Sequence, residues 1–481
     1  ATPSGGLHMD AEHFDLVVIG SGPAGEKGAA QAAYHGKRVA IVERSPFVGG
    51  TAVSTGGLPS KALRETALYV SGWRKKEVYG VSLELDRDAT FERLRLRASE
   101  ISAVMIEAVR RNIERHNIEL IHGDARLAAD RRVHVVSGDA ERVLDADVLL
   151  VATGSRPFRP PDIPFDGDIV IDSDEILQLD RPFESVVIVG AGPVGCEYAS
   201  TFAAVGTRVW LVDIADRLLP MLDAEIAELV VSSLRRSGIE LMLGSRVSSV
   251  ERDGGTVVVE LAGGRTLRAE KLMFGAGRVG NTEGLGLEAA GVAVDGRGRI
   301  AVDDHYRTSA PHVYAAGDVI GLPALASVSM EQARVAMCHA FDIPLKQAVD
   351  RLLPFGIFTI PEAAGVGMTE EAARDAGLDY EVGRGWFAQN NRAAIAGDTD
   401  GLIKLVCMKD GKLLGVHIMG DDAAELVHQG QAVIRHGGNV DEFIHTTFNV
   451  PTRSDAYKYA AYDALKHVEV RAAFGDVVDA G

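Results

Sequence analysis

A glycine-rich turn occurs twice in this chain, and this repeat constrains the fold more than any other feature of the sequence. The first turn spans Gly20–Gly25 (GSGPAG) and the second spans Gly190–Gly195 (GAGPVG). Each turn begins 23 residues before an acidic residue, Glu43 in the first case and Asp213 in the second. A strand, a glycine turn, a helix and a second strand ending in an acid form a dinucleotide-binding unit. The repeat therefore predicts two such units in one chain.

The segments that flank each turn predict the strands and the helix of such a unit. Short apolar runs precede both turns, and runs of this kind are typical of buried parallel strands. A pattern with helical spacing follows each turn, and a second apolar run follows the helix. For the first turn we expect a strand over residues 14–19, a helix over 25–35 and a strand over 38–43; for the second turn the corresponding segments are 186–189, 196–205 and 208–213.

The glycines and the acids have distinct roles in such a unit. The first glycine permits the tight turn, the second lets a pyrophosphate approach the backbone, and the third lets the helix pack close to the strand. The acid accepts a hydrogen bond from a ribose hydroxyl and repels a 2′-phosphate. Asp213 therefore favours NAD(H) over NADP(H), although Arg208 or Arg217 could soften that preference. The candidate nucleotide-binding residues are Gly20, Gly22, Gly25 and Glu43 in the first unit and Gly190, Gly192, Gly195 and Asp213 in the second.

Two units imply two dinucleotides, most simply FAD and a nicotinamide nucleotide, whereas the alternative for each turn is a purely structural role. A chain of 481 residues is also too long for one hydrophobic core. From about Leu353 onward the pattern changes to alternating strands, over 401–408 and 412–420, followed by helices, which suggests a separate α+β domain. We therefore predict an α/β protein with two Rossmann-like dinucleotide-binding domains and a C-terminal α+β domain. The expected boundaries are 9–160 and 282–350 for a split FAD-binding domain, 161–281 for an NAD(P)-binding domain and 351–481 for the C-terminal domain, with the proline-rich segment 156–164 as a linker.

Composition excludes several classes of partner. The formal net charge is −18, whereas nucleic acids and anionic membranes are bound by basic surfaces. No apolar run approaches the roughly 18 residues of a membrane span. Cys196, Cys338 and Cys407 are far apart, and the 14 histidines show no metal-ligand spacing. We therefore expect no disulfide, no metal site and a reduced, cytoplasmic setting.

Four further motifs occur in order along the chain: Gly49-Gly50-Thr51, Pro59-Ser60-Lys61, Ala152-Thr153-Gly154 and Tyr314-Ala315-Ala316-Gly317-Asp318. Together with the glycine turns they resemble the flavin-binding motifs of the pyridine nucleotide–disulfide oxidoreductases, from about Phe14 to Leu465. The resemblance implies FAD as the cofactor, with Asp318 on its ribitol and the following helix directed at the flavin. It also implies a homodimer whose C-terminal domain completes the partner's active site. By the same resemblance Gly50, Thr51, Thr153, Gly154 and Ala326 contact FAD, and Gly277 contacts NAD(P).

The chain departs from this family where a disulfide would be reduced. The two redox-active cysteines of the family are replaced by Ala52 and Gly57. Both replacements are smaller than cysteine, so we expect extra room beside the flavin. The histidine of the C-terminal His-Pro-Thr motif is replaced by Val450, and Asp455 stands where the family has a glutamate. Direct hydride transfer between a nicotinamide and a flavin needs none of the missing groups.

Within this family the chain looks most like the soluble, FAD-containing pyridine nucleotide transhydrogenases. The segments that carry this likeness are 59–64, 312–326 and 446–457. By the resemblance Lys61 would lie beside the flavin, and Glu197 would pair with it near the nicotinamide, as candidate catalytic residues. The alternative is a buried structural ion pair.

Three functions remain open on this basis. The first is ping-pong hydride transfer from NADPH to FAD and then to NAD⁺. The second is an NAD(P)H dehydrogenase that reduces a quinone or a similar acceptor, which Asp213 would suit in an NADH-specific form. The third is a flavin-binding scaffold with little turnover. We interpret His445 as a half-buried interface residue and Cys196 as a small core residue, although each has a reactive alternative.

Overall fold

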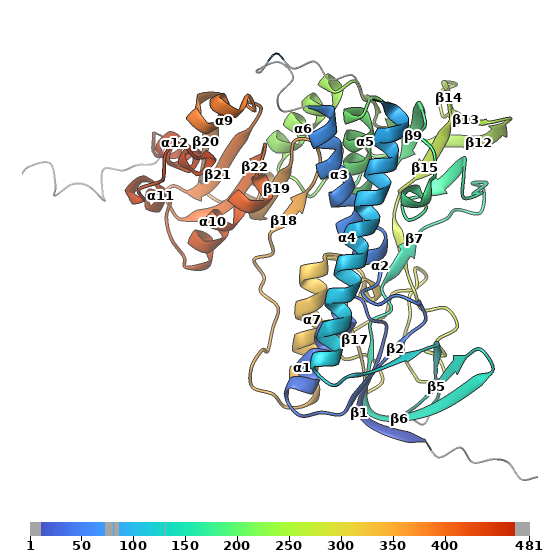
Figure 1. Ribbon diagram of the computed structural model, residues 1–481. Coiled ribbons are helices and arrows are strands. Elements are labelled where there is room, and N and C mark those ends of the chain that lie inside the picture. Colours follow the sequence, from blue (N-terminus) through green and yellow to red (C-terminus); the bar gives the residue numbers. More distant parts are fainter. Residues whose placement is uncertain (1–10, 73–79, 81–85, 130, 467–481) are drawn as a thin grey trace, which may run out of the picture. The chain divides into compact units, whose positions relative to one another are not determined.

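The computed structural model describes residues 11–72, 80, 86–129 and 131–466, whose elements are shown in chain order in Figure 1. Contacts among these residues divide the chain into two compact units. The first unit takes its residues from Ala1–Ser60, Leu96–Phe158 and Gly277–Asp350, and the second from Lys61–Arg95, Arg159–Ala276 and Arg351–Gly481. Each unit contains one of the two glycine turns.

The first unit is built on a seven-stranded sheet whose central strands are parallel. β1 (Glu12–Ile19) pairs with β2 (Val39–Glu43) on one side and with β6 (Ala140–Val151) on the other. β2 is buried at all five residues, as expected for a parallel strand covered on both faces. The sheet continues with β3 (Glu119–His122) beside β2, β17 (Val313–Ala315) beside β6, and β5 (Arg132–Ser137) and β4 (Asp124–Leu127) at an antiparallel edge.

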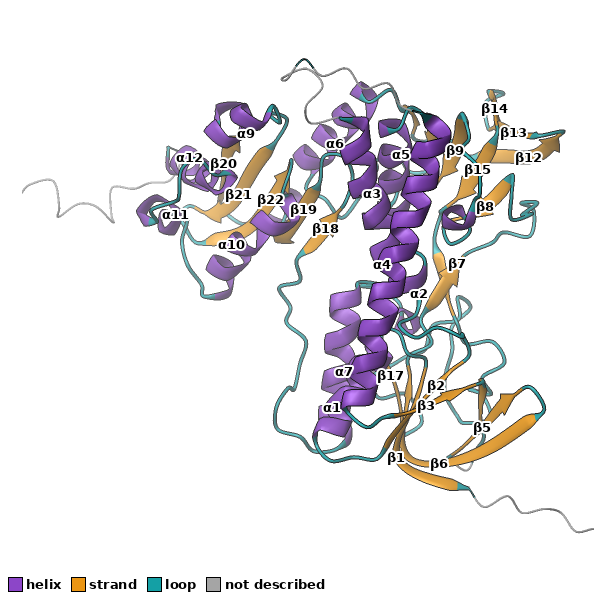
Figure 2. Cartoon of the chain, viewed as in Figure 1, coloured by secondary structure: helices purple, strands orange, loops and turns teal. Residues whose placement is uncertain are grey.

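Two helices rich in small residues pack against each other in the first unit. α1 (Pro23–Tyr34) follows the first glycine turn, and α7 (Ala326–Ala340) runs beside it (Figure 2). The packing is close at Gly28, where an added Cβ would lie 2.5 Å from Leu150 Cδ2 and 3.3 Å from Ala333 Cβ. α1 begins two residues before its predicted start, because proline is favoured in the first turn of a helix. The chain also forms α2 (Thr51–Ser54), α3 (Leu58–Ser71) and α4 (Arg87–Arg115).

Part of the segment predicted as a linker is a strand. β7 (Ser155–Pro157) pairs antiparallel with β16 (Arg278–Gly280) within the first unit. The prolines of segment 156–164 indicated an irregular connection, whereas the pairing depends on a partner strand that is distant in the sequence. The linker prediction is therefore wrong for Arg156 and Pro157.

The second unit repeats this plan around the second glycine turn. β9 (Ser185–Val189), α5 (Pro193–Ala204) and β10 (Arg208–Val212) follow one another, as the sequence predicts. The five-stranded sheet is parallel throughout, in the order β11-β10-β9-β15-β8. Its other strands are β11 (Glu240–Met242), β15 (Lys271–Phe274) and β8 (Val170–Asp172), α6 (Ala224–Arg236) precedes β11, and a three-stranded antiparallel sheet consists of β12 (Val247–Asp253), β13 (Thr256–Leu261) and β14 (Thr266–Ala269).

The C-terminal part of the second unit is an antiparallel sheet with helices, so the predicted fold class is confirmed. Its strand order is β18-β19-β22-β21-β20. α10 (Ala423–Arg435) packs on β19 and β22, and α12 (Ala456–Leu465) packs on β20 and β21. An added Cβ at Gly383 would lie 2.0 Å from Ala460 O, which shows how closely α12 approaches the sheet. The strands are β18 (Phe355–Ile357), β19 (Ala363–Gly367), β20 (Tyr380–Trp386), β21 (Leu402–Met408) and β22 (Leu413–Met419), and the shorter helices are α8 (Glu370–Asp375), α9 (Asn391–Ala396) and α11 (Asp441–His445).

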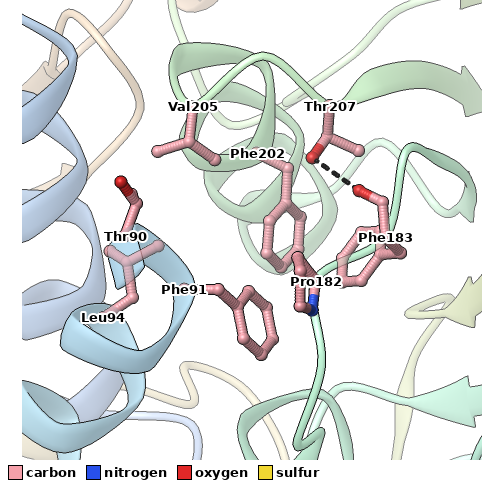
Figure 3. A pocket seen from close by; sticks show the side chains of 8 residues that line it. All are labelled: Thr90, Phe91, Leu94, Pro182, Phe183, Phe202, Val205 and Thr207. Atoms are coloured by element: carbon pink, nitrogen blue, oxygen red, sulfur yellow. Dashed lines mark hydrogen bonds between the residues drawn. The ribbon is translucent and has the colours of Figure 1, made fainter. Parts of the chain in front are cut away.

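An aromatic cluster packs the start of α4 against α5 in the second unit (Figure 3). The ring of Phe183 meets those of Phe91 and Phe202 edge to face, with centroid distances of 6.2 and 5.0 Å. Thr207 Oγ1 donates a hydrogen bond to Phe183 O at 3.2 Å. The pocket between these rings is lined mostly by apolar side chains and contains no residue of the glycine turn. We therefore treat it as a feature of core packing.

A buried ion cluster connects the start of α6 to the C-terminal sheet. Lys404 on β21 is 1% exposed, and its Nζ lies 2.7 Å from Asp223 Oδ1, 2.6 Å from Glu370 Oε2 and 3.0 Å from Glu225 Oε2. Burial opposes the ionisation of Asp223, but the hydrogen bonds from Lys404 Nζ and the Glu370 N–H outweigh it. The pKa of Asp223 therefore lies below its usual value.

Replacing Lys404 with Ala should destabilise the second unit by about 3–5 kcal/mol at pH 7, because it leaves the Asp223 carboxylate buried without a partner. The loss of stability is measured as the difference between the free energies of unfolding in urea of the variant and the wild type. The contribution of Asp223 is present above its unfolded pKa of about 3.9 and is lost as the pH falls through the lower folded pKa. The difference between the variant and the wild type should therefore narrow in acid. Lys409→Ala, which removes an exposed pair with Asp379, should cost less than about 1 kcal/mol, and an equal loss in both variants would contradict the prediction.

Candidate nucleotide-binding site

The two glycine turns have the same backbone geometry. Gly20 and Gly190 adopt φ angles of 98° and 112°, a region that glycine enters without strain. Each donates its N–H to the last carbonyl before the acid, Gly20 to Val42 O and Gly190 to Val212 O, both at 2.8 Å. Each turn is therefore hydrogen-bonded to the end of the second strand of its own unit.

The third glycine of each turn is required by the close approach of the helix. An added Cβ at Gly25 would lie 1.9 Å from Gly20 O, and one at Gly195 would lie 1.8 Å from Gly190 O. No side chain fits at either position, because the neighbouring atom is backbone. The N-termini of α1 and α5 thus pack directly against the turns that precede them.

The second glycine of each turn, in contrast, is not required by any contact among the described residues. Gly22 and Gly192 have ordinary φ angles of −63° and −78°, and no atom of the described residues lies within 4 Å of an added Cβ. They cap α1 and α5, whose first N–H groups have no partner within the helix. Open space at a helix N-terminus is a cradle for a phosphate. The residues present therefore fit a dinucleotide in each unit.

The acid at the end of the second strand is held by the turn in both units. Glu43 Oε2 accepts hydrogen bonds from the Ser21 N–H at 2.9 Å and from Ser21 Oγ at 2.6 Å. Asp213 Oδ2 accepts one from the Ala191 N–H at 2.5 Å. In both units the donor is the second residue of the turn. A carboxylate accepts about four hydrogen bonds, so each acid keeps capacity for a ribose hydroxyl.

The other motifs of the first unit converge on the first glycine turn. An added Cβ at Gly20 would lie 2.5 Å from Ala152 O, which places the motif of Thr153 and Gly154 beside it. Gly50 approaches Gly22, with 3.0 Å between its added Cβ and Gly22 Cα. Gly317, which precedes Asp318, approaches Ala24, with 3.1 Å between the two Cβ positions. Of the remaining predicted residues, Thr51 begins α2, Ala326 begins α7, and Gly277, with a φ angle of 109°, precedes β16.

Asp318 is held by a network that the sequence analysis missed. Its Oδ2 accepts a hydrogen bond from Ser155 Oγ at 2.8 Å, and Arg278 Nε donates to Ser155 Oγ at 2.8 Å. Arg278 also donates from Nη2 to Ser155 O at 2.8 Å. Ser155 directly follows Gly154, and Arg278 directly follows Gly277. The only sequence signal for this network was that both residues are adjacent to predicted motifs. The pairing of β7 with β16 brings Ser155 and Arg278 together.

Lys61 on α3 and Glu197 on α5 form the predicted ion pair in the second unit. Lys61 Nζ lies 2.7 Å from Glu197 Oε2, and the two side chains are 30% and 13% exposed. The other oxygen, Oε1, accepts a hydrogen bond from the Phe358 N–H at 2.9 Å. Lys61 Nζ also lies 5.1 Å from the centroid of the Phe358 ring, within the range of a cation–π contact. The pair is therefore not fully buried, and the loop before β19 fixes its carboxylate.

Arg64, one turn further along α3, binds the same loop. Its Nε donates a hydrogen bond to Thr359 O at 3.0 Å, and its Nη2 lies 3.2 Å from Glu362 Oε1. The side chain of Arg64 is 3% exposed. Burial raises the pKa of Glu362, although the charge of Arg64 opposes this. The partner of Lys61 is thus bound to a loop that Arg64 in turn holds, an arrangement that no local sequence pattern indicated.

The extra room expected beside Ala52 and Gly57 is absent on the side of Gly57 that faces Ala52. An added Cβ there would lie 2.3 Å from Ala52 O and 2.7 Å from Ala52 Cα. The Gly57 N–H donates to Thr51 O at 3.2 Å, so the turn after α2 closes on itself. Backbone therefore occupies the space on the side of Gly57 that faces Ala52, whereas extra room on the side of the flavin stays a prediction.

The remaining predicted residues differ in their surroundings. Cys196 is completely buried, and burial raises the pKa of its thiol, in keeping with a core residue. His445 and Val450 are exposed in the single chain, whereas Asp455 is half-buried and directly precedes α12 without a side-chain hydrogen bond to the helix. Among the described residues, no helix is long and apolar enough to cross a membrane.

The chain is similar to known proteins in both sequence and structure. The family model described as "Pyridine nucleotide-disulphide oxidoreductase" matches residues 14–337, and that of the dimerisation domain of the same family matches residues 353–461. The chain is 44% identical to the soluble pyridine nucleotide transhydrogenase of Mycobacterium bovis over 94% of this chain and 97% of that protein. It is 40% identical to the protein of that name from Chromohalobacter salexigens, over 96% of this chain and all of that protein.

Solved structures agree with these matches. LpdA from Mycobacterium tuberculosis superposes with a TM-score of 0.86 at 27% identity, over 94% of this chain and 99% of that chain. The HOCl-induced flavoprotein disulfide reductase RclA from Escherichia coli superposes with a TM-score of 0.84 at 27% identity, over 93% of this chain and 99% of that chain. The family resemblance identified in the sequence is thus confirmed.

Gly192→Ala should fold normally and yet bind a nucleotide at least about tenfold more weakly, because the methyl group enters open space where a pyrophosphate would lie. Gly22→Ala should lower FAD retention in the same way. Thermal midpoints, FAD content and calorimetric titration with ADP-ribose measure these effects. Gly255→Ala is a matched control, since an added Cβ there also meets no described atom within 4 Å. Unchanged affinity for ADP-ribose in Gly192→Ala would contradict the assignment.

Proposed function

Because the chain belongs to the pyridine nucleotide-disulphide oxidoreductase family, and to its branch of soluble pyridine nucleotide transhydrogenases, we propose that it transfers hydride between nicotinamide nucleotides with FAD as its cofactor. The proposed reaction is NADPH + NAD⁺ → NADP⁺ + NADH, with the nucleotides binding in turn at one site. The observation that carries the proposal is the second glycine turn, where the open position at Gly192 and the fixed carboxylate of Asp213 suit a nicotinamide nucleotide.

The first unit would hold FAD. The N-terminus of α1 and the open position at Gly22 would take the pyrophosphate, Glu43 the adenosine ribose, and Asp318 the ribitol. Ser155 and Arg278 would keep the Asp318 carboxylate in place. When bound, FAD accepts a hydride from one nicotinamide and passes it to another.

Lys61 and Glu197 would act near the reacting atoms. The family resemblance supports this assignment, and so does the partial exposure of the ion pair. A lysine beside the flavin would stabilise the negative charge that reduction adds there. Ala52 and Gly57 provide no thiol, so no step through a protein disulfide is available at these positions. A quinone reductase is the less favoured alternative, because the curated relatives named above are transhydrogenases.

We also propose that the protein is a homodimer that works in the cytoplasm. The match to a dimerisation domain over residues 353–461 supports the first statement. Val450, Tyr459 and Tyr462 lie in this region and are 58, 50 and 49% exposed in the single chain. Exposed apolar side chains of this kind are suited to a subunit interface.

The reaction itself can be tested by anaerobic mixing. Holoenzyme reduced with NADPH and then mixed with thio-NAD⁺ should form thio-NADH in an amount equal to the NADPH oxidised, while the flavin absorbance bleaches and recovers. Recovery of the flavin with a quinone but not with thio-NAD⁺ would overturn transhydrogenation in favour of quinone reduction. If neither NADPH nor NADH bleached the flavin absorbance, the remaining function would be that of a flavin-binding scaffold with little turnover.

Arg64→Gln should slow flavin reduction by about tenfold or more, because it releases the loop that holds Glu197 and so displaces Lys61. The flavin absorbance spectrum and its reduction potential should shift as well, which loss of stability alone would not cause. Arg64→Lys should retain part of the activity, since a lysine can reach one of the two acceptors. The control is Glu65→Gln, which removes the 64% exposed partner of Arg64 and should have no effect. A flavin reduction potential and a flavin reduction rate in Arg64→Gln equal to those of the wild type would contradict this role of Arg64.

A further inference from the structure

We infer that Glu362 is a positioning residue for the Lys61–Glu197 pair, and that only its ionised carboxylate keeps the pair in place. Glu362 acts on the pair through Arg64 and the loop 358–362, which connects β18 to β19. The inference rests on the proposed function, because the position of the pair matters to the reaction only if the pair acts in hydride transfer.

The loop 358–362 fixes the carboxylate of Glu197. Its first residue, Phe358, donates its N–H to Glu197 Oε1 at 2.9 Å. The next residue, Thr359, is completely buried, and its carbonyl accepts a hydrogen bond from Arg64 Nε at 3.0 Å. Arg64 therefore holds the loop one residue away from the N–H that binds Glu197.

The contact between Glu362 and Arg64 depends on charge. Arg64 Nη2 lies 3.2 Å from Glu362 Oε1, but Nη2 has no hydrogen-bond partner among the described residues. The side chains of Arg64 and Glu362 are 3% and 12% exposed, so little water screens their attraction. A neutral group at position 362 would lose this attraction, with no hydrogen bond to take its place. The ionisation of Glu362 therefore decides how firmly the guanidinium is held beside Thr359 O.

The surroundings of Glu362 oppose its ionisation. Burial raises the pKa of Glu362, and the carboxylates of Asp421 and Asp422, which precede α10, raise it further. The charge of Arg64 acts against both causes without outweighing them. Arg453 reduces the effect of the two aspartates, since its Nη2 lies 3.6 Å from Asp421 Oδ2 and its Nη1 lies 2.6 Å from Asp422 Oδ2. Glu362 therefore takes up a proton at a higher pH than an ordinary glutamate.

A purely structural role does not account for this charge. The stability that Glu362 contributes is present below its unfolded pKa and is lost as the pH rises through its higher folded pKa. Above the folded pKa, the ionised side chain is therefore less favourable for folding than a neutral one of the same shape. The hydrogen bond that Glu362 Oε2 accepts from the Ala424 N–H at 3.2 Å does not need the charge, because glutamine also has an oxygen acceptor. A charge that costs stability is typical of a functional position.

The first test replaces Glu362 with Gln and observes the loop directly, without relying on catalysis. In the holoenzyme at pH 8, the amide hydrogen of Phe358 should exchange at least about tenfold faster in Glu362→Gln than in the wild type. The urea midpoint of the variant should be equal to that of the wild type or higher. In the wild type the protection of this amide, corrected for the intrinsic exchange rate, should decrease as the pH falls through the folded pKa of Glu362. Glu65→Gln, which removes the exposed partner of the same guanidinium, is the control and should leave the exchange rate and the urea midpoint unchanged.

The second test follows flavin reduction against pH. In the wild type the rate of flavin reduction by NADPH or NADH should fall in acid as Glu362 takes up its proton. In Glu362→Gln the rate at pH 8 should be at least about threefold lower, and this acid limb should be absent. Asp422→Asn should move the limb to lower pH, because it removes one of the opposing charges. Asparagine suits this position, where φ is 64°, and its amide oxygen can still accept a hydrogen bond from Arg453.

The outcomes separate this inference from the proposed function. Wild-type protection of the Phe358 amide in Glu362→Gln, or an acid limb that persists in this variant, would overturn the positioning role. A urea midpoint well below that of the wild type would also overturn it, since Glu362 would then act through stability. Lost protection in Glu362→Gln, together with a wild-type flavin that neither nucleotide reduces, would overturn the proposed function while the attachment of the loop through Glu362 stands.

Discussion

The contact between helix and turn at Gly25 and Gly195 is the constraint on which both proposed nucleotide sites depend. An added Cβ would lie 1.9 Å from a backbone oxygen at Gly25 and 1.8 Å from one at Gly195, so neither position has room for a side chain. This contact sets the helix N-terminus against the strand end. It also carries the second residue of the turn to the acid and leaves the second glycine facing open space. The phosphate cradle and the ribose acceptor thus follow from one close approach, which explains why the two units share a geometry although their sequences differ elsewhere.

Much of this arrangement was predictable, because the interactions that produce it are local in sequence. Apolar runs, glycine spacing and a terminal acid all lie within one β-α-β unit, and both units folded as expected. The contacts that sequence analysis missed join distant residues. Ser155 and Asp318 are 163 positions apart, and Glu197 and Phe358 are 161 apart. Such pairs are decided by tertiary packing, for which a single sequence contains no periodic signal.

The segment around Ala52 and Gly57 shows a different limit. The side chains of alanine and glycine are smaller than that of cysteine, which predicted free space at these two positions. The structure shows instead that the absence of a side chain at Gly57 lets the backbone of the turn approach Ala52. Removing volume creates a cavity only where the surrounding chain cannot collapse into it. A short turn with two glycines in succession, Gly56 and Gly57, offers little resistance to collapse.

The C-terminal part of the second unit contacts residues of the proposed nucleotide site without belonging to either glycine turn. Phe358 holds the carboxylate of Glu197, and Glu371 occupies the guanidinium of Arg217. The first contact orders a pair proposed to act in hydride transfer, whereas the second engages one of the two arginines that could soften a preference for NAD(H). Both depend on one stretch of chain, between β18 and the end of α8. A change in this stretch would therefore alter reaction rate and nucleotide preference together, even though none of its residues need touch the nucleotide.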